Sequence, residues 1–563
     1  MRPTVCHPLL SEGTIEARAY QLEAVDEALS GSMMLVLPTA AGKTAVAWMA
    51  IVESLNRNGG WALMVAPTVA LVQQHLSGMM EVIELQGGAE AISITGRDPP
   101  SKRDGVWGSS NLIVATPQVV RNDVERGALD LSECCILVLD EVHHCTGSHA
   151  MAMVSDMYMS MRKEPLILGT TASPGYRAED VREVCSRMGA GRIHIRGSEE
   201  PMLSEYLSEL EVEEVTVRVP QEIRDLAEPL RLWQTGIVDQ QRRLGRYVMT
   251  GMISYSGLSN AMDRSQIAIS RGESSAYKSM SEIATAMRLH HLINCLLSQG
   301  ISASKEFLDR MEGGEDGKKK SVLAFLRDPR IRELRKTLSG MDESHSKMGA
   351  VRRLVRERIR RDVDSRVIVF ANYRDTITSL DRALAGLDGV RSIQFVGQSS
   401  RGGREGLSPK RQVERLDSFR SGESNVLLAT SIGEEGLDIP AADLVIFYEP
   451  VSSEIRTIQR RGRTGRRRLG EVVVLIAEDT RDEGSMAAAK RKEKGMQRAV
   501  HRVRRGLPRG HHSDLSNLGS FSILGESRIP ASDFVIGERE RSRPEIIKED
   551  RNERLSGREM RTK

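Results

Sequence analysis

The sequence predicts an α/β protein in which two parallel-sheet domains are separated by an all-helical insert. Short apolar runs alternate with helical patterns over 31–200 and again over 346–500, as in parallel sheets covered by helices. Between them, apolar residues recur at three- and four-residue spacing, which is typical of long helices. The expected parts are a first α/β domain at 1–205, the insert at 206–345, a second α/β domain at 346–500, and a charged tail at 501–563 that is flexible or weakly packed.

Seven apolar runs are the candidate strands of the first α/β domain. They are 33–37, 61–66, 91–95, 111–115, 135–139, 166–169 and 192–196. Several of them end in small or polar residues, such as Pro67-Thr68 after the second run and Thr116-Pro117 after the fourth. Ligands of open α/β sheets bind at the carboxyl ends of the strands, so residues at these positions are candidates for function.

The first of these strands runs into a phosphate-binding loop, VLPTAAGKT. A strand, a loop of small residues, GK[ST] and a helix form the context that such a loop requires. Backbone N–H groups would meet the phosphates, Lys43 would place its charge at the β/γ oxygens, and the Thr44 hydroxyl would ligate Mg²⁺. Leu37 stands where the motif usually has its first glycine. The predicted nucleotide-binding loop comprises Leu37, Pro38, Thr39, Ala40, Ala41, Gly42, Lys43 and Thr44.

Two further features accompany the loop. Upstream, Tyr20 and Gln21 precede a helical pattern; the glutamine could hydrogen-bond an adenine and the tyrosine could stack on it, although an ordinary helix start explains them too. Downstream, Asp140 and Glu141 follow the apolar run CILVL. Asp140 would hold Mg²⁺ through water, and Glu141 would position or polarise the attacking water. The alternative for this pair is a solvated acidic turn.

The insert carries helical patterns at 224–252, 281–297 and 305–311. Basic residues recur on its helices: Arg231, Arg242, Arg243, Arg246, Arg288, Arg330, Arg332, Arg335 and Lys336. Two interpretations remain open for them, a solvated charged face and a contact surface for a duplex backbone.

The second α/β domain has candidate strands at 366–371, 392–396, 425–430, 443–448 and 471–477. Beside them lies the run QRRGRTGR, in which Arg463 and Arg466 are interleaved with glycines. A basic patch does not explain this interleaving. An arginine finger delivered across a cleft to a γ-phosphate does explain it.

Composition limits the possible partners. The net charge is only +3, so a nucleic-acid surface must come from local clustering of basic residues. Aromatic residues make up 4% of the chain, which argues against binding by stacking many bases. The six cysteines have no CxxC spacing, as expected for reduced thiols. Without a signal peptide or an apolar run of membrane-spanning length, we expect a cytoplasmic protein with no membrane partner.

The motifs PTAAGKT, APTVALVQQH, ATPQ, DEVH, TAS, VIVFANYR, ATSIGEEGLDIP and QRRGRTGR occur in the order that superfamily 2 DEAD/DEAH-type helicases have. More narrowly, EAR before YQ, PLILGTTASPG, FVGQ and GEEGLDIPAADLVIFYEP resemble the archaeal Hef helicases and their Fanconi anaemia group M and Mph relatives. Ala40 and Val142 depart from this family, where glycine and alanine are commoner. The resemblance implies two RecA-like domains, ATP and Mg²⁺ as cofactors, and a thumb-like insert that grips branched duplex.

The resemblance also implies roles for individual residues. The catalytic set would be Lys43, Asp140, Glu141, His143, Gln459, Arg463 and Arg466. Nucleotide contacts beyond the phosphate loop would come from Arg18, Gln21, Gly436 and Asp438, the last two near the ribose. Nucleic acid would meet Pro67, Thr68, Thr116, Pro117, Thr171, Ser173, Asn372 and Thr430, with Thr171 and Ser173 coupling it to the ATP state.

The implied function is an ATP-dependent DNA helicase or translocase, moving 3′→5′ on branched DNA such as stalled forks in repair and recombination. Too few residues follow 500 for the nuclease and helix-hairpin-helix region of full-length archaeal Hef, so we expect a helicase without its own nuclease. A separate nuclease or a sliding clamp would then be a protein partner. Two alternatives stay open: a double-stranded-RNA-dependent ATPase of the innate-immune or Dicer type, and a nucleotide-gated scaffold that recruits a nuclease through its tail.

Overall fold

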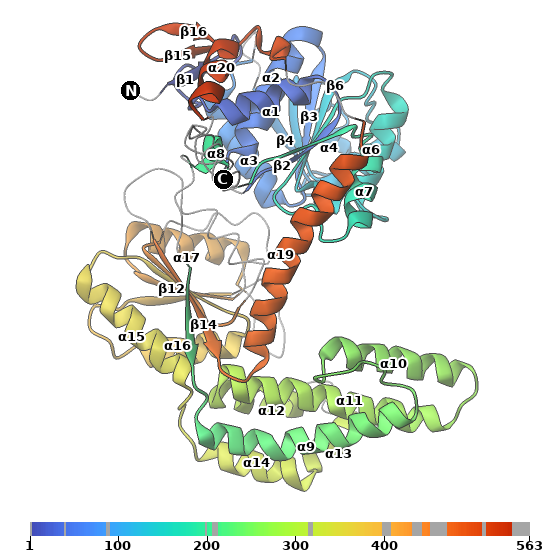
Figure 1. Ribbon diagram of the computed structural model, residues 1–563, viewed down its shortest axis with the longest axis vertical. Coiled ribbons are helices and arrows are strands. Elements are labelled where there is room, and N and C mark those ends of the chain that lie inside the picture. The colour runs from blue at the N-terminus through green and yellow to red at the C-terminus, as the bar shows by residue number, and fades with distance from the viewer. Residues whose placement is uncertain are drawn as a thin grey trace, which may run out of the picture. The chain divides into compact units, whose positions relative to one another are not determined.

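The computed structural model describes residues 3–38, 41–85, 90–197, 200–204, 206, 212–313, 319–396, 407–430, 442–450, 470–508 and 514–542. The chain divides into two compact units. The first combines Met1–Ser208 with Glu493–Lys563, and the second is Glu209–Lys492 (Figure 1).

The first unit is built on a seven-stranded sheet with the order β4-β5-β3-β6-β7-β2-β8, in which all paired strands are parallel. The strands are β2 (Met33–Val36), β3 (Trp61–Val65), β4 (Ile92–Ile94), β5 (Leu112–Ala115), β6 (Cys134–Asp140), β7 (Ile167–Thr171) and β8 (Arg192–Ile195). Most of their residues are buried, because helices cover both faces of such a sheet.

Two apolar cores lie on the two faces of this sheet. One core contains α1 (Ala19–Leu29), α2 (Lys43–Asn58) and α3 (Val69–Val82). The other contains α5 (Pro117–Glu125), α6 (Ala150–Met161) and α7 (Ala178–Arg187). The short helices α4 (Pro100–Arg103) and α8 (Pro201–Ser204) also belong to the first unit. The carboxyl edge of the sheet therefore carries the loops that lead into these helices.

The second unit contains a six-stranded parallel sheet with the order β11-β12-β10-β13-β14-β9. Its strands are β9 (Val212–Val217), β10 (Val367–Ala371), β11 (Ser392–Phe395), β12 (Val426–Thr430), β13 (Leu444–Phe447) and β14 (Glu471–Ala477). Helices α15 (Ser346–Arg361) and α16 (Arg374–Leu384) pack in the core on one face, and α17 (Pro409–Ser421) in the core on the other.

The helical insert belongs to this second unit. It comprises α9 (Gln221–Arg243), α10 (Tyr255–Ser270), α11 (Ser275–Asn294), the π-helix η3 (Cys295–Gln299), α12 (Ile301–Gly313), α13 (Lys320–Arg327) and α14 (Pro329–Ser339). Two apolar clusters hold it together, and one of them also includes Ala477 of β14. Among the helices that the structure describes, none has the length and apolarity needed to cross a membrane. All six cysteines are buried and unpaired.

The predicted fold class is confirmed, but the segment 212–219 does not open the insert as expected. Its residues form β9, the edge strand of the second sheet, with a register that runs from Val212 beside Val472 to Val217 beside Ala477. An alternating apolar pattern identifies a strand without indicating which sheet it joins, because a parallel edge strand can come from far away in the chain.

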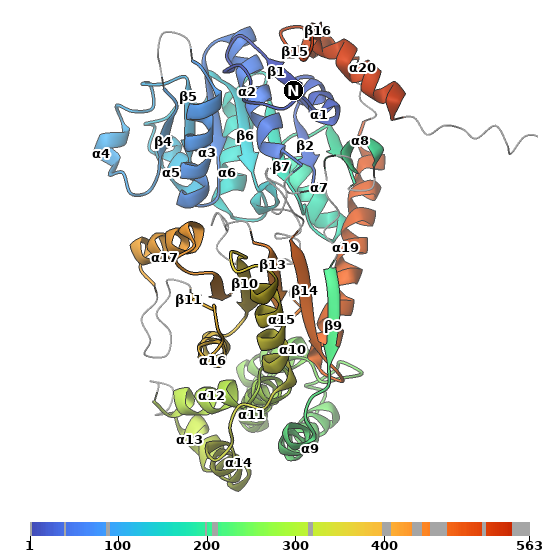
Figure 2. The same ribbon diagram turned by 90° about the vertical axis from the view of Figure 1, so that its left-hand side faces the viewer.

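The expectation of a weakly packed tail is wrong for residues 514–542. Helix α19 (Arg481–Gly506) crosses position 500, and Val500 is buried in the first unit's core. Beyond it, η5 (Ser516–Leu518), β15 (Ser522–Leu524), β16 (Arg528–Pro530) and α20 (Ala531–Arg541) pack beside α1 (Figure 2). Strand β15 pairs with both β16 and β1 (Thr4–Cys6), so the two ends of the described chain share one antiparallel sheet. We call residues 514–542 the C-terminal module.

The apolar residues of this segment divide into exposed and buried ones. Leu524, Ile529 and Ile536 are exposed. Six of the ten are buried in the core that also contains α1 and α2: Leu515, Leu518, Phe521, Ile523, Ala531 and Val535. A low overall apolar content predicted a solvated tail, whereas the positions of these residues on one face decide the outcome.

Candidate functional site

The phosphate loop connects β2 to α2 as the sequence predicts. Gly42 precedes the helix with φ 78°, a left-handed conformation that favours glycine, and Lys43 and Thr44 begin the helix. The Lys43 ammonium is buried and donates to the carbonyl of Leu37 at 3.2 Å. The Leu37 side chain is also buried, in the core beneath the loop. Leu37, which replaces the usual glycine, therefore contacts Lys43 through its backbone carbonyl.

Helix α1 holds the phosphate loop through two side chains. The Tyr20 hydroxyl donates to the carbonyl of Ala41 at 2.8 Å, and Gln21 Nε2 donates to the same oxygen at 3.0 Å. A Cβ on Gly42 would lie 2.1 Å from Gln21 Nε2, so the contact also requires glycine there. Arg18 lies at the start of α1, with Nη2 2.8 Å from the Glu16 carboxylate. Because the Tyr20 ring is fully buried, the expectation that it stacks on an adenine is wrong.

Asp140 ends β6 at the carboxyl edge of the sheet. Its Oδ2 lies 2.8 Å from His75 Nε2, and its Oδ1 accepts a hydrogen bond from the Thr170 hydroxyl at 2.7 Å. Burial alone would raise the pKa of Asp140, but the hydrogen bonds from His75 and Thr170 and the charge of Lys43 hold it below its usual value. Asp140 is therefore a carboxylate, and His75 carries its proton on Nε2.

His75 was not predicted as a site residue. It lies on α3, seven positions after Thr68, so the two residues lie on the same face of the helix. The signal was available, because the motif APTVALVQQH ends on this histidine. Spacing alone did not say that its ring would meet the acid at the end of β6, since that contact depends on the order of the strands.

Glu141 is linked to the end of β7 through the ring of His143. Its φ of 51° is unusual for a residue with a side chain, and it precedes the short helix η2 (Val142–His144). His143 Nδ1 lies 3.3 Å from the Glu141 carboxylate and 3.2 Å from the Thr171 hydroxyl. The Thr171 hydroxyl also accepts the backbone N–H of Ser173 at 3.1 Å. The DEVH and TAS segments are thus joined by hydrogen bonds at one edge of the sheet.

The residues present fit a magnesium ion. Thr44 offers a hydroxyl oxygen and Asp140 a carboxylate that is held in its charged form, and these are the hard oxygen donors that Mg²⁺ prefers. Each Asp140 oxygen accepts one hydrogen bond from the protein and keeps a lone pair for a water molecule. Coordination of Mg²⁺ by Asp140 through water stays a prediction, for which these lone pairs are available.

The candidate nucleic-acid residues of the first unit differ in exposure. Thr68 caps α3, where its hydroxyl accepts the N–H of Leu71 at 3.3 Å, and Pro67 precedes it. Thr116 and Thr171 are buried, so their side chains would act through neighbouring groups. Pro117 is the first residue of α5.

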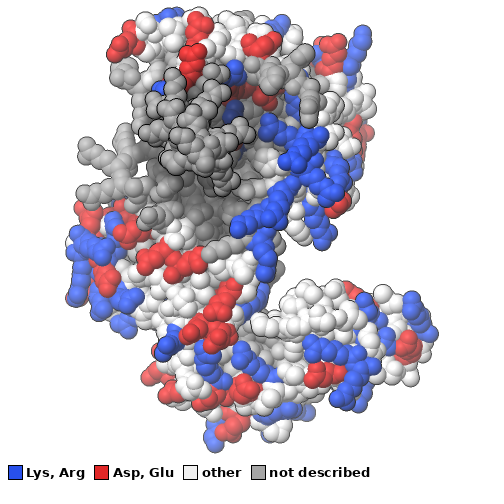
Figure 3. Space-filling view, viewed as in Figure 1, with Lys and Arg blue, Asp and Glu red and all other residues white. Residues whose placement is uncertain are grey.

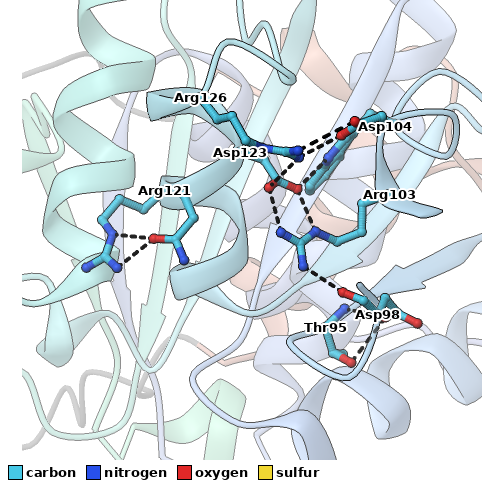
Figure 4. A network of polar contacts seen from close by, with 9 residues as sticks. Thr95, Asp98, Arg103, Asp104, Arg121, Asp123 and Arg126 are labelled. Carbon is cyan, nitrogen blue, oxygen red and sulfur yellow. Dashed lines mark hydrogen bonds and ion pairs between the residues drawn. The ribbon is translucent and has the colours of Figure 1, made fainter. Parts of the chain in front are cut away.

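A buried ion pair anchors the helix that Pro117 begins. Arg103 donates to Asp123 of α5 through Nε at 2.8 Å and Nη2 at 2.7 Å, as Figure 4 shows. Trp107 and Arg126 donate to the same carboxylate. Although burial opposes it, the hydrogen bonds from Arg103 and Trp107 lower the pKa of Asp123. The loop at Thr116 therefore leads into a helix with a fixed position.

In the second unit, Asn372 follows β10 and Thr430 ends β12. The backbone N–H of Asn372 donates to the Glu449 carboxyl group at 3.1 Å. Glu449 follows β13, is buried, and was not predicted; the acid in VIFYEP was its signal. Burial raises the pKa of Glu449 to about 7. Seven further predicted residues lie outside the described ranges, so their roles stay predictions: Thr39, Ala40, Gly436, Asp438, Gln459, Arg463 and Arg466.

Two family models match this chain. The DEAD/DEAH box helicase model matches residues 18–181, and the helicase conserved C-terminal domain model matches residues 346–468. Among solved structures, the helicase domain of Pyrococcus furiosus Hef is similar, with a TM-score of 0.68 and 33% identity. The match covers 85% of this chain and 99% of that chain.

Curated relatives agree with these matches. A Methanocaldococcus jannaschii protein named as an ATP-dependent RNA helicase is 33% identical over 494 residues, which cover 88% of this chain and 62% of the relative. The ATP-dependent DNA helicase mph1 of Neurospora crassa is 29% identical over 504 residues, which cover 86% and 43%. The chain thus spans less than two thirds of the length of either relative. The family models and the Hef helicase domain together show that this chain belongs to the superfamily 2 helicases of the Hef and Fanconi anaemia group M type, a family of ATP-dependent helicases.

Proposed function

We propose that this chain is an ATP-dependent DNA helicase or translocase that moves 3′→5′ on branched DNA, such as a stalled fork. One observation carries the ATPase part of the proposal. The phosphate loop, the Asp140 carboxylate and the linked His143–Thr171 pair all lie at the carboxyl edge of one parallel sheet. This is the edge at which open α/β sheets bind nucleotides.

In this proposal the residues of the first unit divide the work on ATP. Lys43 binds the β/γ-phosphate oxygens and the N–H groups at the start of α2 bind the phosphates. Thr44 and Asp140 hold Mg²⁺, which when bound neutralises charge on the phosphate oxygens. Glu141 orients the attacking water, and the hydrogen bond that His75 donates keeps Asp140 charged and in place. Arg463 and Arg466 are the proposed arginine fingers.

The same geometry supports a route from ATP to nucleic acid. His143 touches both the Glu141 carboxylate and the Thr171 hydroxyl, so a change at the γ-phosphate would reach the TAS segment through one ring. Nucleic acid would meet the loops at Pro67, Thr116 and Asn372. These would be contacts to phosphates, so we expect binding that tolerates any sequence and weakens with salt.

For the insert, the structure separates two kinds of basic residue. Arg242, Arg246, Arg330 and Arg335 form ion pairs with acids of the insert, which supports a structural role for them. Arg231, Arg243 and Lys336 are exposed, and no ion pair joins them to another described residue. Arg231 and Arg243 lie on α9 and Lys336 lies on α14, and Figure 3 shows basic and acidic side chains mixed on the visible face of the insert. We propose that the exposed set contacts the backbone of a branched duplex.

The test compares ATPase activity on forked DNA, plain duplex DNA, duplex RNA and single strands. We expect the largest stimulation by forked DNA. Lys43→Ala and Glu141→Gln proteins should still bind DNA and lose its stimulation of ATP hydrolysis by about 10²–10³-fold, as when one group that stabilises the transition state is removed. Retained turnover in either variant would contradict the assigned site. Stronger stimulation by duplex RNA would favour the activity for which the M. jannaschii relative is named.

A nuclease or sliding clamp that docks on the chain's end remains a prediction. A pull-down should compare the full chain with one that ends after residue 542, because the C-terminal module is part of the first unit's core. Strand displacement measured on the same proteins separates an active helicase from a scaffold that hydrolyses ATP without unwinding.

A further inference from the structure

We propose that the C-terminal module positions helix α1 and thereby sets the affinity and base selectivity of the nucleotide site at the start of that helix. The proposal rests on the proposed ATPase function. It gives residues 514–542 a role in a site formed by the first third of the chain.

The module supplies the hydrogen-bond donors for a buried acid of α1. Asp26 is 1% exposed, and its two oxygens accept the backbone N–H groups of Leu515 at 3.3 Å and Asn517 at 2.9 Å. The Asn517 amide also donates to the Asp26 carbonyl at 3.1 Å and to the Ser30 hydroxyl at 2.9 Å. A buried carboxylate that loses its donors is costly, so these contacts permit one arrangement of α1 and the module.

A second acid of α1 is held by an ion pair from the module. Glu23 is 3% exposed and forms salt bridges with Arg539 of α20 and with Arg196, which follows β8. The two arginines reach different oxygens of the same carboxylate, so α1 is held between the module and the edge of the sheet. Charge-assisted pairs of this kind fix orientation as well as distance.

The module also holds α2, the helix that begins at Lys43. Glu53 of α2 is fully buried and accepts a hydrogen bond from the Ser520 hydroxyl at 3.1 Å. Arg57 of α2 donates to the Asn517 carbonyl at 2.6 Å and to its side-chain oxygen at 2.8 Å. The two helices that carry the candidate nucleotide residues are therefore both bound to the module through polar contacts.

The other end of α1 holds the phosphate loop. Tyr20 and Gln21, in its first turn, donate to the carbonyl of Ala41. Glu23 and Asp26 follow along the same 11-residue helix. A short α-helix moves as a rigid body, so a shift of its contacts with the module displaces Gln21, the predicted adenine-recognition residue, relative to the loop.

Polar contacts make a positioning role more specific than apolar packing would. A purely apolar interface tolerates small slides, because many packings of similar energy exist. Buried carboxylates on α1 and α2 tolerate them less, since a slide would remove both backbone donors of Asp26, the Arg539 pair of Glu23 and the Ser520 hydrogen bond of Glu53. The three acids, Glu23, Asp26 and Glu53, therefore favour one register of the module on the two helices.

The test uses two arginines of α20 as a matched pair. Arg539 bridges to Glu23 of α1, whereas Arg541 pairs with Glu538 within α20. We expect Arg539→Ala to raise the KM for ATP about fivefold, with kcat within about twofold, as a charge-assisted contact to a positioning helix is lost. The ratio of kcat/KM for ATP to that for GTP should fall with it. Arg541→Ala should leave both quantities unchanged, and Arg539→Lys should restore part of the loss.

Asn517→Ala gives a second, independent variant on another part of the module. Both variants are also compared in the binding of fluorescent ATP and GTP analogues, without hydrolysis, and in melting temperature. If Arg539→Ala and Asn517→Ala lower only the melting temperature and keep the selectivity of the Arg541→Ala protein, the proposal is overturned and the module is structural alone. If the unaltered protein shows no DNA-stimulated turnover, the proposed function fails, while the binding assay still decides the role of the module.

Discussion

The two parallel sheets of this protein each end a central strand in an acid, and the two acids have opposite properties. Asp140 follows CILVL and Glu449 follows LVIFY, so the sequence presents them alike. In the structure, hydrogen bonds from His75 and Thr170 keep the pKa of Asp140 low, whereas burial raises the pKa of Glu449 to about 7. One acid is held charged, and the other changes its protonation state near neutral pH.

The difference comes from the groups that face each acid. Asp140 accepts side-chain hydrogen bonds from His75 and Thr170, and these outweigh the effect of its burial on its pKa. The Glu449 carboxyl group accepts the backbone N–H of Asn372 and feels the charge of Lys347, but Lys347 forms its salt bridge with Asp482, whose own charge raises the pKa of Glu449, and burial prevails. An acid at a strand end can therefore hold a cation or support a loop, and its surroundings decide which.

Substitution by the neutral amide separates the two acids most strongly. Asp140→Asn removes a charge from the proposed magnesium site, and we expect DNA-stimulated ATPase activity to fall on the order of 10³-fold. Glu449→Gln resembles the protonated acid, a form that is substantially populated near neutral pH, so activity should stay within about twofold of the unaltered protein. Steady-state ATPase assays with forked DNA measure both. Equal losses in the two variants would contradict the contrast.

The contrast also shows what sequence patterns can predict. Apolar runs located the strands of both parallel sheets except β9, which was assigned to the insert, and the GKT and DEVH segments located the residues at the edge of the first sheet, because strand ends and loop motifs are local features. His75 and Glu449 were not predicted because their partners lie on distant segments. Asp140 is 65 positions from His75, and Asn372 is 77 positions from Glu449. Contacts of that kind depend on strand order, which no local pattern contains.

The packing of the C-terminal module was not predicted for a related reason. Its charged residues suggested a solvated segment, and two of the decisive contacts join Asp26 to positions 489 and 491 residues further along the chain. The sequence does hold a signal in the short apolar runs around Phe521 and Val535, but each run is too short to identify the sheet or helix that it covers.

Replacing the histidine that supports Asp140 should have a smaller effect than replacing the acid itself. In His75→Ala the carboxylate keeps the Thr170 hydrogen bond but loses a donor that orients it, and partners of metal-holding groups typically contribute about 10–100-fold to activity or metal affinity. We expect a loss of ATPase activity in that range, and a higher Mg²⁺ concentration for half-maximal rate. Gln73→Ala, on the same helix and away from Asp140, is the control, since its amide donates to Ser93. A rate loss that does not depend on Mg²⁺ would contradict the proposed role of Asp140.

The smallest expected effect is on stability and depends on pH. The pKa of Glu449 rises from its ordinary 4.5 to about 7 in the folded protein, so between these values the folded state binds more protons than the unfolded state. Stability from this group is therefore fully present below about pH 4.5 and is lost as the pH rises to about 7, by at most about 3 kcal/mol. Glu449→Gln removes the titration, so its melting temperature should decline less than that of the unaltered protein between pH 5 and pH 8. Parallel curves for the two proteins would mean that Glu449 is charged in the folded state, and that the two strand-end acids do not differ in this way.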